Sequence, residues 1–513
     1  MKKGLSLLLS LLMIFLLAAC SGKTPPTDQT EEKKTSATTE NTGNDLPQGD
    51  PNSRENIKDN LPNLNYEKAP LKIGYTLDAY DDRFGSIGVQ SDGDLIAYDI
   101  FKRNAYVEDR LNCILDFIPF GETLSEWYSV NSIVYNQILV GGNECADVFM
   151  CTEHQLTSSR IYNLFVDCNN LEYIDLEKPY WWTNMMKECS LDGSTLPFLQ
   201  GDLSMLNYIK SSVLYYNKTL YKNYYPDSDE NALYNMVLDG TWTLDELMDL
   251  TKDIYSDLNQ NNVRDNGDLF GITVGDQAAV WGEYLQFLFG CDLTLYSRQY
   301  VKKAGMEVPL IEMNNGRVRD AVEKVHNLMN QTGSFADPTT DIDNNARYFA
   351  QGNMMFYPGR FSCSMDGLLS EMTDPRGVLI TPKYDASQEK YVTLVANSCA
   401  ATALPVGKSD ETYSMASAVL EAMACYNYKE TAVTLLETLL SSKYASDSTT
   451  GKVVDMIVKS TTKSFIYAND TVTDGIVYTM SQGVKENNFT RLYQEAAEAA
   501  NNNLIDYIIA LYQ

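Results

Sequence analysis

Between residues 71 and 164, short apolar segments with strand character alternate with longer segments whose apolar residues recur at helical spacing. This alternation is typical of an open parallel β-sheet with helices on both faces, so it assigns the chain to the α/β class. In such sheets, ligands bind beyond the carboxyl ends of the strands. The predicted strands are 71–75, 114–118 and 146–150, and the predicted helices are 94–111, 123–139 and 153–164.

The rest of the chain predicts a second, mixed part followed by a helical tail. A strand at 213–216 breaks at Asn217 into a helix, and Thr243 with Glu246 forms a capping box for a helix that runs to about residue 258. From Asp410 onward the pattern is mostly helical, and no internal repeat is visible. Further predicted strands are 270–274, the end of 346–357, 378–381 and 391–404, and further predicted helices are 278–290 and 315–331.

The N-terminal segment has the three parts of a secretory signal: two lysines near the start, an apolar run over residues 5–17, and small residues before Cys20. The sequence LAAC at 17–20 resembles a bacterial lipobox, which predicts removal of residues 1–19, lipidation of Cys20 and a location on the extracellular face of the cell membrane. The alternatives are an ordinary signal and an uncleaved anchor, although a membrane-spanning helix needs ~20 apolar residues. Residues 20–66 contain few apolar side chains, which predicts a flexible tether.

Composition excludes several classes of function. The net charge of −29 argues against a nucleic-acid partner, because phosphates would be repelled by such a surface. Ten cysteines are present without zinc-type spacing, and if Cys20 carries lipid the others either pair or serve as small core residues. With two histidines and no nucleophile-elbow, zinc-protease or phosphate-loop motif, the sequence offers little for catalysis.

Several longer segments, read together and in order, resemble the family-1 extracellular solute-binding lipoproteins of ABC sugar importers of Gram-positive type. These segments are VLYYNKTLYKN, GTWTLDELMDLTKDIYSDLNQNN, ARYFAQGNMMFYPGRF and GVLITPKYDASQEKYVT. The resemblance implies a two-lobed periplasmic-binding-protein-like fold of type II, with a helical C-terminal part. We expect 67–200 and 376–425 in the first lobe, and 201–375 and 426–513 in the second.

Sugar-binding clefts combine flat aromatic faces with carboxylate and guanidinium groups that bind hydroxyls. Candidate side chains of these types follow the first and third predicted strands, and others lie in or after later strands and helices. For each of them, the alternative is an ordinary role at the surface or in packing. Trp181, Trp182 and Trp242 are predicted to be core residues. The candidate ligand-binding residues are Tyr80, Asp81, Asp82, Arg83, Glu153, His154, Trp281, Glu283, Arg360 and Phe361.

Residues 257–268 form a loop with oxygen-bearing side chains at positions 1, 3, 5, 9 and 12. Calcium takes six to eight oxygen ligands, and a loop of this spacing can supply them together with the position-7 carbonyl. Asn262 replaces the usual glycine at position 6, and an Asp replaces the usual Glu at position 12. The alternative is a polar turn without metal. The predicted ligands of a structural Ca2+ are Asp257, Asn259, Asn261, Val263, Asp265 and Asp268.

The resemblance implies a binding protein and not an enzyme: a monomer, without a catalytic cofactor, that captures a sugar or oligosaccharide in a cleft between the lobes. It would deliver this ligand to the subunits of an ABC permease in the membrane. Asp81 with Asp82 keeps a glycan hydrolase open as an alternative, since glycoside hydrolysis uses two carboxyl groups. A surface scaffold or adhesin without a small ligand is the third class.

Overall fold

The computed structural model describes residues 53–76, 88, 93–120, 129–157, 162–275, 284–337, 344–365, 367–441 and 448–512. The chain divides into two units, residues 1–50 and 51–513, and every described element belongs to the second unit. Cys20 and the predicted signal lie outside the described residues. Within these described ranges, no helix combines the length and apolar character needed to cross a bilayer.

The first sheet confirms the predicted strand–helix alternation. Its strand order is β13-β3-β1-β2, and β1 pairs in parallel with both β2 and β3, so that Ile73 lies opposite Phe117 and Val148. β13 adds an antiparallel edge strand on β3. The strands are β1 (Pro70–Thr76), β2 (Ile114–Phe120), β3 (Val148–Thr152) and β13 (Ala400–Ala403).

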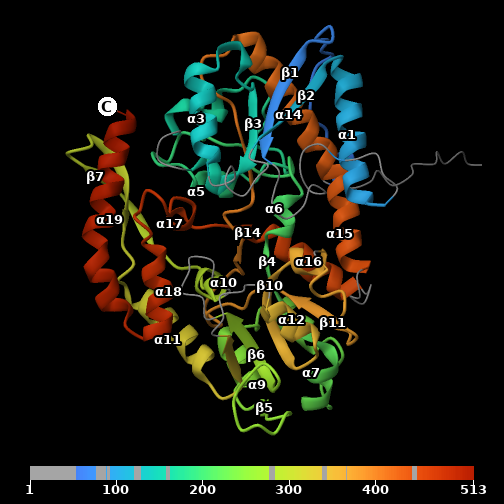
Figure 1. Cartoon of the computed structure of the whole chain (residues 1–513), viewed down its shortest axis with the longest axis vertical. Helices are drawn as coiled ribbons and strands as arrows, with labels where there is room; N and C mark the ends of the chain where they lie inside the picture. Colours follow the sequence, from blue (N-terminus) through green and yellow to red (C-terminus); the bar gives the residue numbers. More distant parts are fainter. Residues whose placement is uncertain are drawn as a thin grey trace, which may run out of the picture. The chain divides into compact units, whose positions relative to one another are not determined.

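Helices α1 (Leu95–Leu111) and α14 (Asp410–Lys429) pack against each other beside this sheet (Figure 1). Asp94 begins α1, because its side chain accepts hydrogen bonds from the backbone N–H groups of Ile96 and Ala97. α14 is buried along much of its length, where alanines allow close packing against β1. The other helices of this part are α3 (Val130–Val140), α4 (Glu153–Leu156), α5 (Thr183–Glu188) and α6 (Leu206–Ile209), with short 3-10 turns at Gly142–Glu144, Tyr162–Leu164 and Cys168–Asn170.

The second sheet has the order β11-β4-β10-β6-β5, with β9 also paired to β6. Every residue of β4 is buried, and Asn217 at its end caps the following helix by accepting a hydrogen bond from the backbone N–H of Leu220. The strands are β4 (Ser212–Asn217), β5 (Tyr255–Ser256), β6 (Leu269–Gly275), β9 (Ser334–Asp337), β10 (Met354–Arg360) and β11 (Arg376–Leu379). The helices of this part are α7 (Lys218–Tyr224), α8 (Ala232–Leu238), α9 (Leu244–Thr251), α10 (Leu285–Gly290), α11 (Gly316–Asn330), α12 (Asn344–Ala350) and α13 (Ser362–Met365).

Three expectations about the elements need correction. β11, at the start of the segment 376–425 expected in the first lobe, pairs with β4 of the second sheet, and the chain rejoins the first sheet only at β13. The helix that begins after Thr243 ends at Thr251 instead of about 258, because β5 pairs with β6. Of the helix predicted at 153–164, the described residues form the single turn α4 and the 3-10 turn Tyr162–Leu164, while 158–161 lie outside the described residues. Burial of Trp181 and Trp242 is confirmed, while Trp182 is half-buried.

The predicted helical tail is present, and a hairpin that the sequence did not predict packs beside it. β7 (Tyr296–Val301) and β8 (Met306–Ile311) form the hairpin, and α19 (Phe489–Tyr512) packs on β8. Asn501 of α19 hydrogen-bonds both the N–H and the C=O of Ile311, which satisfies backbone groups at this strand edge. The other tail helices are α15 (Thr431–Ser441), α16 (Ser448–Lys459), α17 (Phe465–Ala468) and α18 (Val477–Glu486).

Residues 53–69, which we call the N-terminal strap, include the 3-10 turn Arg54–Asn56 and lie against α1 and α14. The backbone N–H groups of Tyr66 and Lys68 donate to the carbonyls of Leu111 and Asn112. Apolar side chains of the strap pack against the core beneath α14. The prediction of a flexible tether over 20–66 is therefore wrong for 53–66, because these residues pack against α1 and α14.

Candidate functional site

Three chain segments run side by side between the two sheets. Ser211 forms an isolated bridge with Val395, and the two-residue strands β12 (Thr393–Leu394) and β14 (Thr461–Thr462) pair in parallel. Leu199 forms a further bridge with Thr402 of β13. The segments around 199–211, 393–402 and 461–463 thus bring residues far apart in sequence to one place, which we call the crossing region.

Six of the predicted ligand-binding residues lie outside the described residues, so the structure places none of them. The six are Tyr80, Asp81, Asp82, Arg83, Trp281 and Glu283. Their role as sugar ligands stays a prediction.

Glu153 is placed differently from its prediction as an accessible ligand. It follows β3 as expected, but its side chain is fully buried and forms an ion pair with Lys463 of the crossing region, whose side chain is also fully buried. His154 beside it is half-buried, and burial lowers the pKa of its imidazole. Glu153 therefore holds the crossing region together instead of facing a ligand.

Four groups surround this carboxylate, and with it they form what we call the Glu153–Lys463 cluster. The Oε2 atom of Glu153 accepts hydrogen bonds from Lys463 Nζ, from Gln200 Nε2 at 2.7 Å and from Cys189 Sγ at 3.5 Å. Cys399 Sγ lies 3.8 Å from the same oxygen and 3.2 Å from Lys463 Nζ. Burial alone would lower the pKa of Lys463, but its interactions with Cys399, Glu153 and Cys189 raise it, so the ammonium form is favoured.

Sequence reasoning did not find this cluster. Lys463 is 310 residues from Glu153 and has no neighbouring motif. In the sequence, Lys463 is a charged residue that follows two threonines, and this pattern is too common to single it out.

Arg360 ends β10 on the side of the crossing region. Burial raises the pKa of the Tyr467 hydroxyl, and the positive charges of Arg360 and Lys463 act in the opposite direction. Arg360 is half-exposed, so its guanidinium stays a candidate for binding a ligand. Phe361, by contrast, is 1% exposed and packs in the main core, which corrects its prediction as a cleft aromatic.

At position 6, the loop predicted to bind calcium has the left-handed backbone conformation that is usual for such loops. Asn262, at position 6, has φ = 60°, the left-handed conformation that glycine usually supplies there. Asp257 accepts a hydrogen bond from the backbone N–H of Asn262 at 2.9 Å. The Asp265 carboxylate accepts from the side-chain amides of Asn259 and Asn261 at 3.0 and 2.7 Å.

Two carboxylate oxygens of this loop lack partners. Asp268 is fully buried, and its Oδ1 atom, like Oδ1 of Asp257, has no hydrogen-bond partner among the described residues. A buried carboxylate oxygen without a partner is costly, and a bound cation would satisfy it. However, in the described part of the chain, no three His, Cys, Asp or Glu side chains lie close enough to one another to bind a metal ion jointly. A metal here would depend on amide and backbone oxygens as well.

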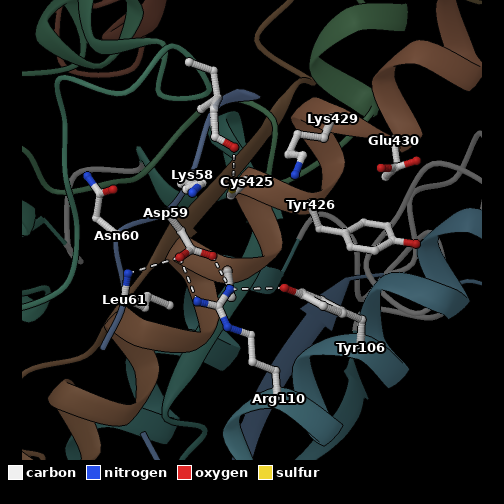
Figure 2. A pocket seen from close by; sticks show the side chains of 12 residues that line it. Lys58, Asp59, Asn60, Leu61, Tyr106, Arg110, Cys425, Tyr426, Lys429 and Glu430 are labelled. Carbon is white, nitrogen blue, oxygen red and sulfur yellow. Dashed lines mark hydrogen bonds and ion pairs between the residues drawn. The ribbon is translucent and has the colours of Figure 1, made fainter. Parts of the chain in front are cut away.

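A separate pocket of about 410 Å³ lies between the strap, α1 and the end of α14 (Figure 2). Arg110 and Asp59 form a bidentate ion pair in it, with Arg110 Nη2 2.8 Å from Asp59 Oδ1. Tyr106 and Tyr426 pack against each other with ring centroids 5.3 Å apart. The ion pair between Asp59 of the strap and Arg110 of α1 thus joins the strap to this helix.

Comparison with known proteins agrees with the fold. The chain superposes on the cyclic α-maltosyl-1,6-maltose binding protein from Arthrobacter globiformis with a TM-score of 0.55 and 11% identity, covering 86% of this chain and 100% of that one. It superposes on a cyclo/maltodextrin-binding protein complexed with maltotetraose with a TM-score of 0.51 and 11% identity, covering 87% and 98%.

The chain therefore has the fold of these two sugar-binding proteins. The α/β, two-lobed architecture implied by the sequence resemblance is thereby confirmed. No family model and no curated protein sequence matches the chain.

Proposed function

We propose that this protein is an extracellular solute-binding protein that captures a carbohydrate between its two sheets and delivers it to an ABC permease. The observation that carries the proposal is the superposition on two sugar-binding proteins over 86% or more of the chain. Because fold alone does not fix function, the proposal also rests on the sequence resemblance to the family-1 lipoproteins and on the predicted lipidation of Cys20.

The proposed mechanism is closure of the two parts of the chain around the ligand. A ligand that contacts both parts favours the closed state by its differential affinity for the two states, and no bond is made or broken. Arg360 at the end of β10 and His154 after β3 are the described candidates that would contact hydroxyl groups, with Tyr80–Arg83, Trp281 and Glu283 as the remaining candidates.

A thermal-shift panel of mono- and oligosaccharides tests this proposal. A ligand at 100 times its Kd stabilises the state that it binds by about 2.7 kcal/mol, so we expect at least one glycan to raise the melting temperature by several degrees. Arg360→Ala should weaken that response, whereas Arg319→Ala, on the exposed face of α11, should not change it.

A panel in which no glycan changes the melting temperature would contradict carbohydrate capture. Release of reducing ends from a polysaccharide would favour the hydrolase alternative instead.

We also propose that residues 257–268 bind a structural Ca2+. The left-handed Asn262 and the two unpartnered carboxylate oxygens support this assignment. Asp257 and Asp268 would bind through carboxylate oxygens, Val263 through its carbonyl, and the remaining predicted ligands through side-chain oxygens. Asp265 would exchange its amide partners for the ion.

Calcium binding predicts that a chelator lowers the melting temperature of the wild-type protein and that added calcium restores it. Asp268→Asn should lose this response, because it removes one charge from a fully buried ligand. Asp249→Asn, on the exposed face of α9, is the matched control and should keep it. Equal melting temperatures with and without chelator would show that the loop is a metal-independent turn.

A further inference from the structure

The Glu153–Lys463 cluster combines an amine, two thiols and a carboxylate in a site closed to solvent. Lys463, Cys189 and Cys399 are each at most 4% exposed, and Glu153 is fully buried. Within this cluster, Cys399 Sγ lies 3.2 Å from Lys463 Nζ.

We propose that Lys463 and Cys399 are a covalent modification site, at which dioxygen converts the pair into a lysine–cysteine bridge with one oxygen between Nζ and Sγ. The bridge would join Cys399, directly before β13 of the first sheet, to Lys463, directly after β14. The assignment does not depend on the carbohydrate proposal.

Both reacting atoms are held in place by the surrounding structure. Lys463 Nζ donates to Glu153 Oε2, which also accepts a hydrogen bond from Gln200 at 2.7 Å. Cys399 is held through its backbone, because its carbonyl accepts from the N–H of Glu153 at 2.8 Å. The 3.2 Å between nitrogen and sulfur leaves only a small adjustment for one oxygen atom to enter between them.

The reaction balances with dioxygen as the oxidant. The ammonium of Lys463 passes one proton to the Glu153 carboxylate, one N–H bond and the S–H bond break, and N–O and O–S bonds form. One oxygen atom of dioxygen enters the bridge, and the other leaves as water with the two remaining hydrogens. Nitrogen and sulfur each lose two electrons, and dioxygen gains four.

Charge favours the product. Two opposite charges buried without solvent are expensive to maintain, even when they are paired. After the reaction, Lys463 is part of a neutral bridge and Glu153 is a neutral carboxylic acid, so neither buried charge remains. Glu153 thus supplies the proton acceptor that the step requires.

Cys189 is the competing thiol and provides the control. Its Sγ contacts Glu153 Oε2 at 3.5 Å and Gln200 Oε1 at 3.5 Å. Cys399 has the direct contact with Lys463, so the bridge should form at Cys399. A disulfide between the two cysteines is the alternative oxidation product.

Peptide mass spectrometry of the full-length protein tests the site. One preparation is exposed to air, and a second is kept anaerobic with reductant. In the aerated sample we expect a linked pair of peptides containing Cys399 and Lys463, heavier than their sum by one oxygen and lighter by two hydrogens. Reductant should separate them. Cys189→Ser should retain the linked pair, and Cys399→Ser and Lys463→Arg should abolish it.

Three outcomes would overturn the proposal: unmodified Cys399 and Lys463 after aeration, a Cys189–Cys399 disulfide, or oxidised Cys399 without a link to lysine. Since Lys463→Arg changes a buried ion pair, that variant could fail to fold. The aerated wild type and Cys189→Ser then decide the question by themselves, because both are mapped for the same linked peptides.

Discussion

Burial raises the pKa values of two carboxyl groups in this protein, Glu421 and Asp202. Glu421 on α14 accepts hydrogen bonds from the Tyr180 hydroxyl and, at 2.9 Å, from the Trp181 indole. Burial raises the pKa of Glu421 to about 7, against the opposing effect of these donors. Asp202 of the crossing region shows the same behaviour, with burial raising its pKa to about 7. Both groups therefore bind protons in the folded state at a pH where the unfolded chain has lost them.

Glu421→Gln should flatten the dependence of stability on pH. A pKa raised in the folded state contributes stability that is complete below the unfolded value of 4.5 and is lost as pH rises through about 7. The wild-type free energy of unfolding should therefore be larger at pH 5.5 than at pH 8, with Glu421 contributing at most about 3 kcal/mol. Urea unfolding at the two pH values measures the difference.

The control for this change is Glu437→Gln, on an exposed position of α15, which should keep the wild-type pH dependence. Equal pH dependence in the wild type and in Glu421→Gln would contradict the assignment. Asp202 remains in both variants, so part of the slope should persist.

At the scale of elements, the strap shows how a polar segment becomes part of the fold. Four of its side chains, Ile57, Leu61, Leu64 and Tyr66, pack against the core beneath α14. Arg54 donates to the carbonyl of Tyr428 at 3.0 Å, and its guanidinium lies 4.3 Å from that ring centre. The strap thus covers apolar surface that α1 and α14 would otherwise expose.

Removing residues 51–66, which include most of the strap, should destabilise the protein. A chain that begins at Glu67 should have a lower melting temperature than a chain that begins at Pro51, because covering each of several apolar side chains contributes about 1 kcal/mol or more. Calorimetry of the two truncated chains measures the difference. Identical melting temperatures would mean that the strap rests on the surface without stabilising it.

At the scale of the whole molecule, the two sheets are joined by short segments instead of a large shared sheet. β12 and β14 contribute two residues each to the crossing region, and isolated bridges connect Ser211 with Val395 and Leu199 with Thr402. Such sparse backbone pairing lets side-chain contacts, including the Glu153–Lys463 cluster, set how firmly the region is held. Motion between the sheets is what the proposed capture of a ligand requires.

Local patterns in the sequence were sufficient for the elements that depend on local forces. The parallel strands β1, β2 and β3, the start of α9 after Thr243 and the break from β4 into α7 at Asn217 were all predictable. Periodicity and capping depend on residues that are close in the chain, so they can be recognised from the sequence alone. The β7–β8 hairpin and the early end of α9 were not predictable, because distant pairing partners decide them.

The features of the candidate site likewise fall into those that local sequence predicts and those that long-range contacts decide. The sequence by itself determined the α/β class, the resemblance to sugar-binding lipoproteins and the loop at 257–268, because each depends on residue types at short spacing. Only the tertiary structure decided that Glu153 is buried against Lys463, that Phe361 is a core residue and that residues 53–66 cover α1 and α14. These outcomes depend on contacts across hundreds of residues, where burial and charge pairing override what any local pattern indicates.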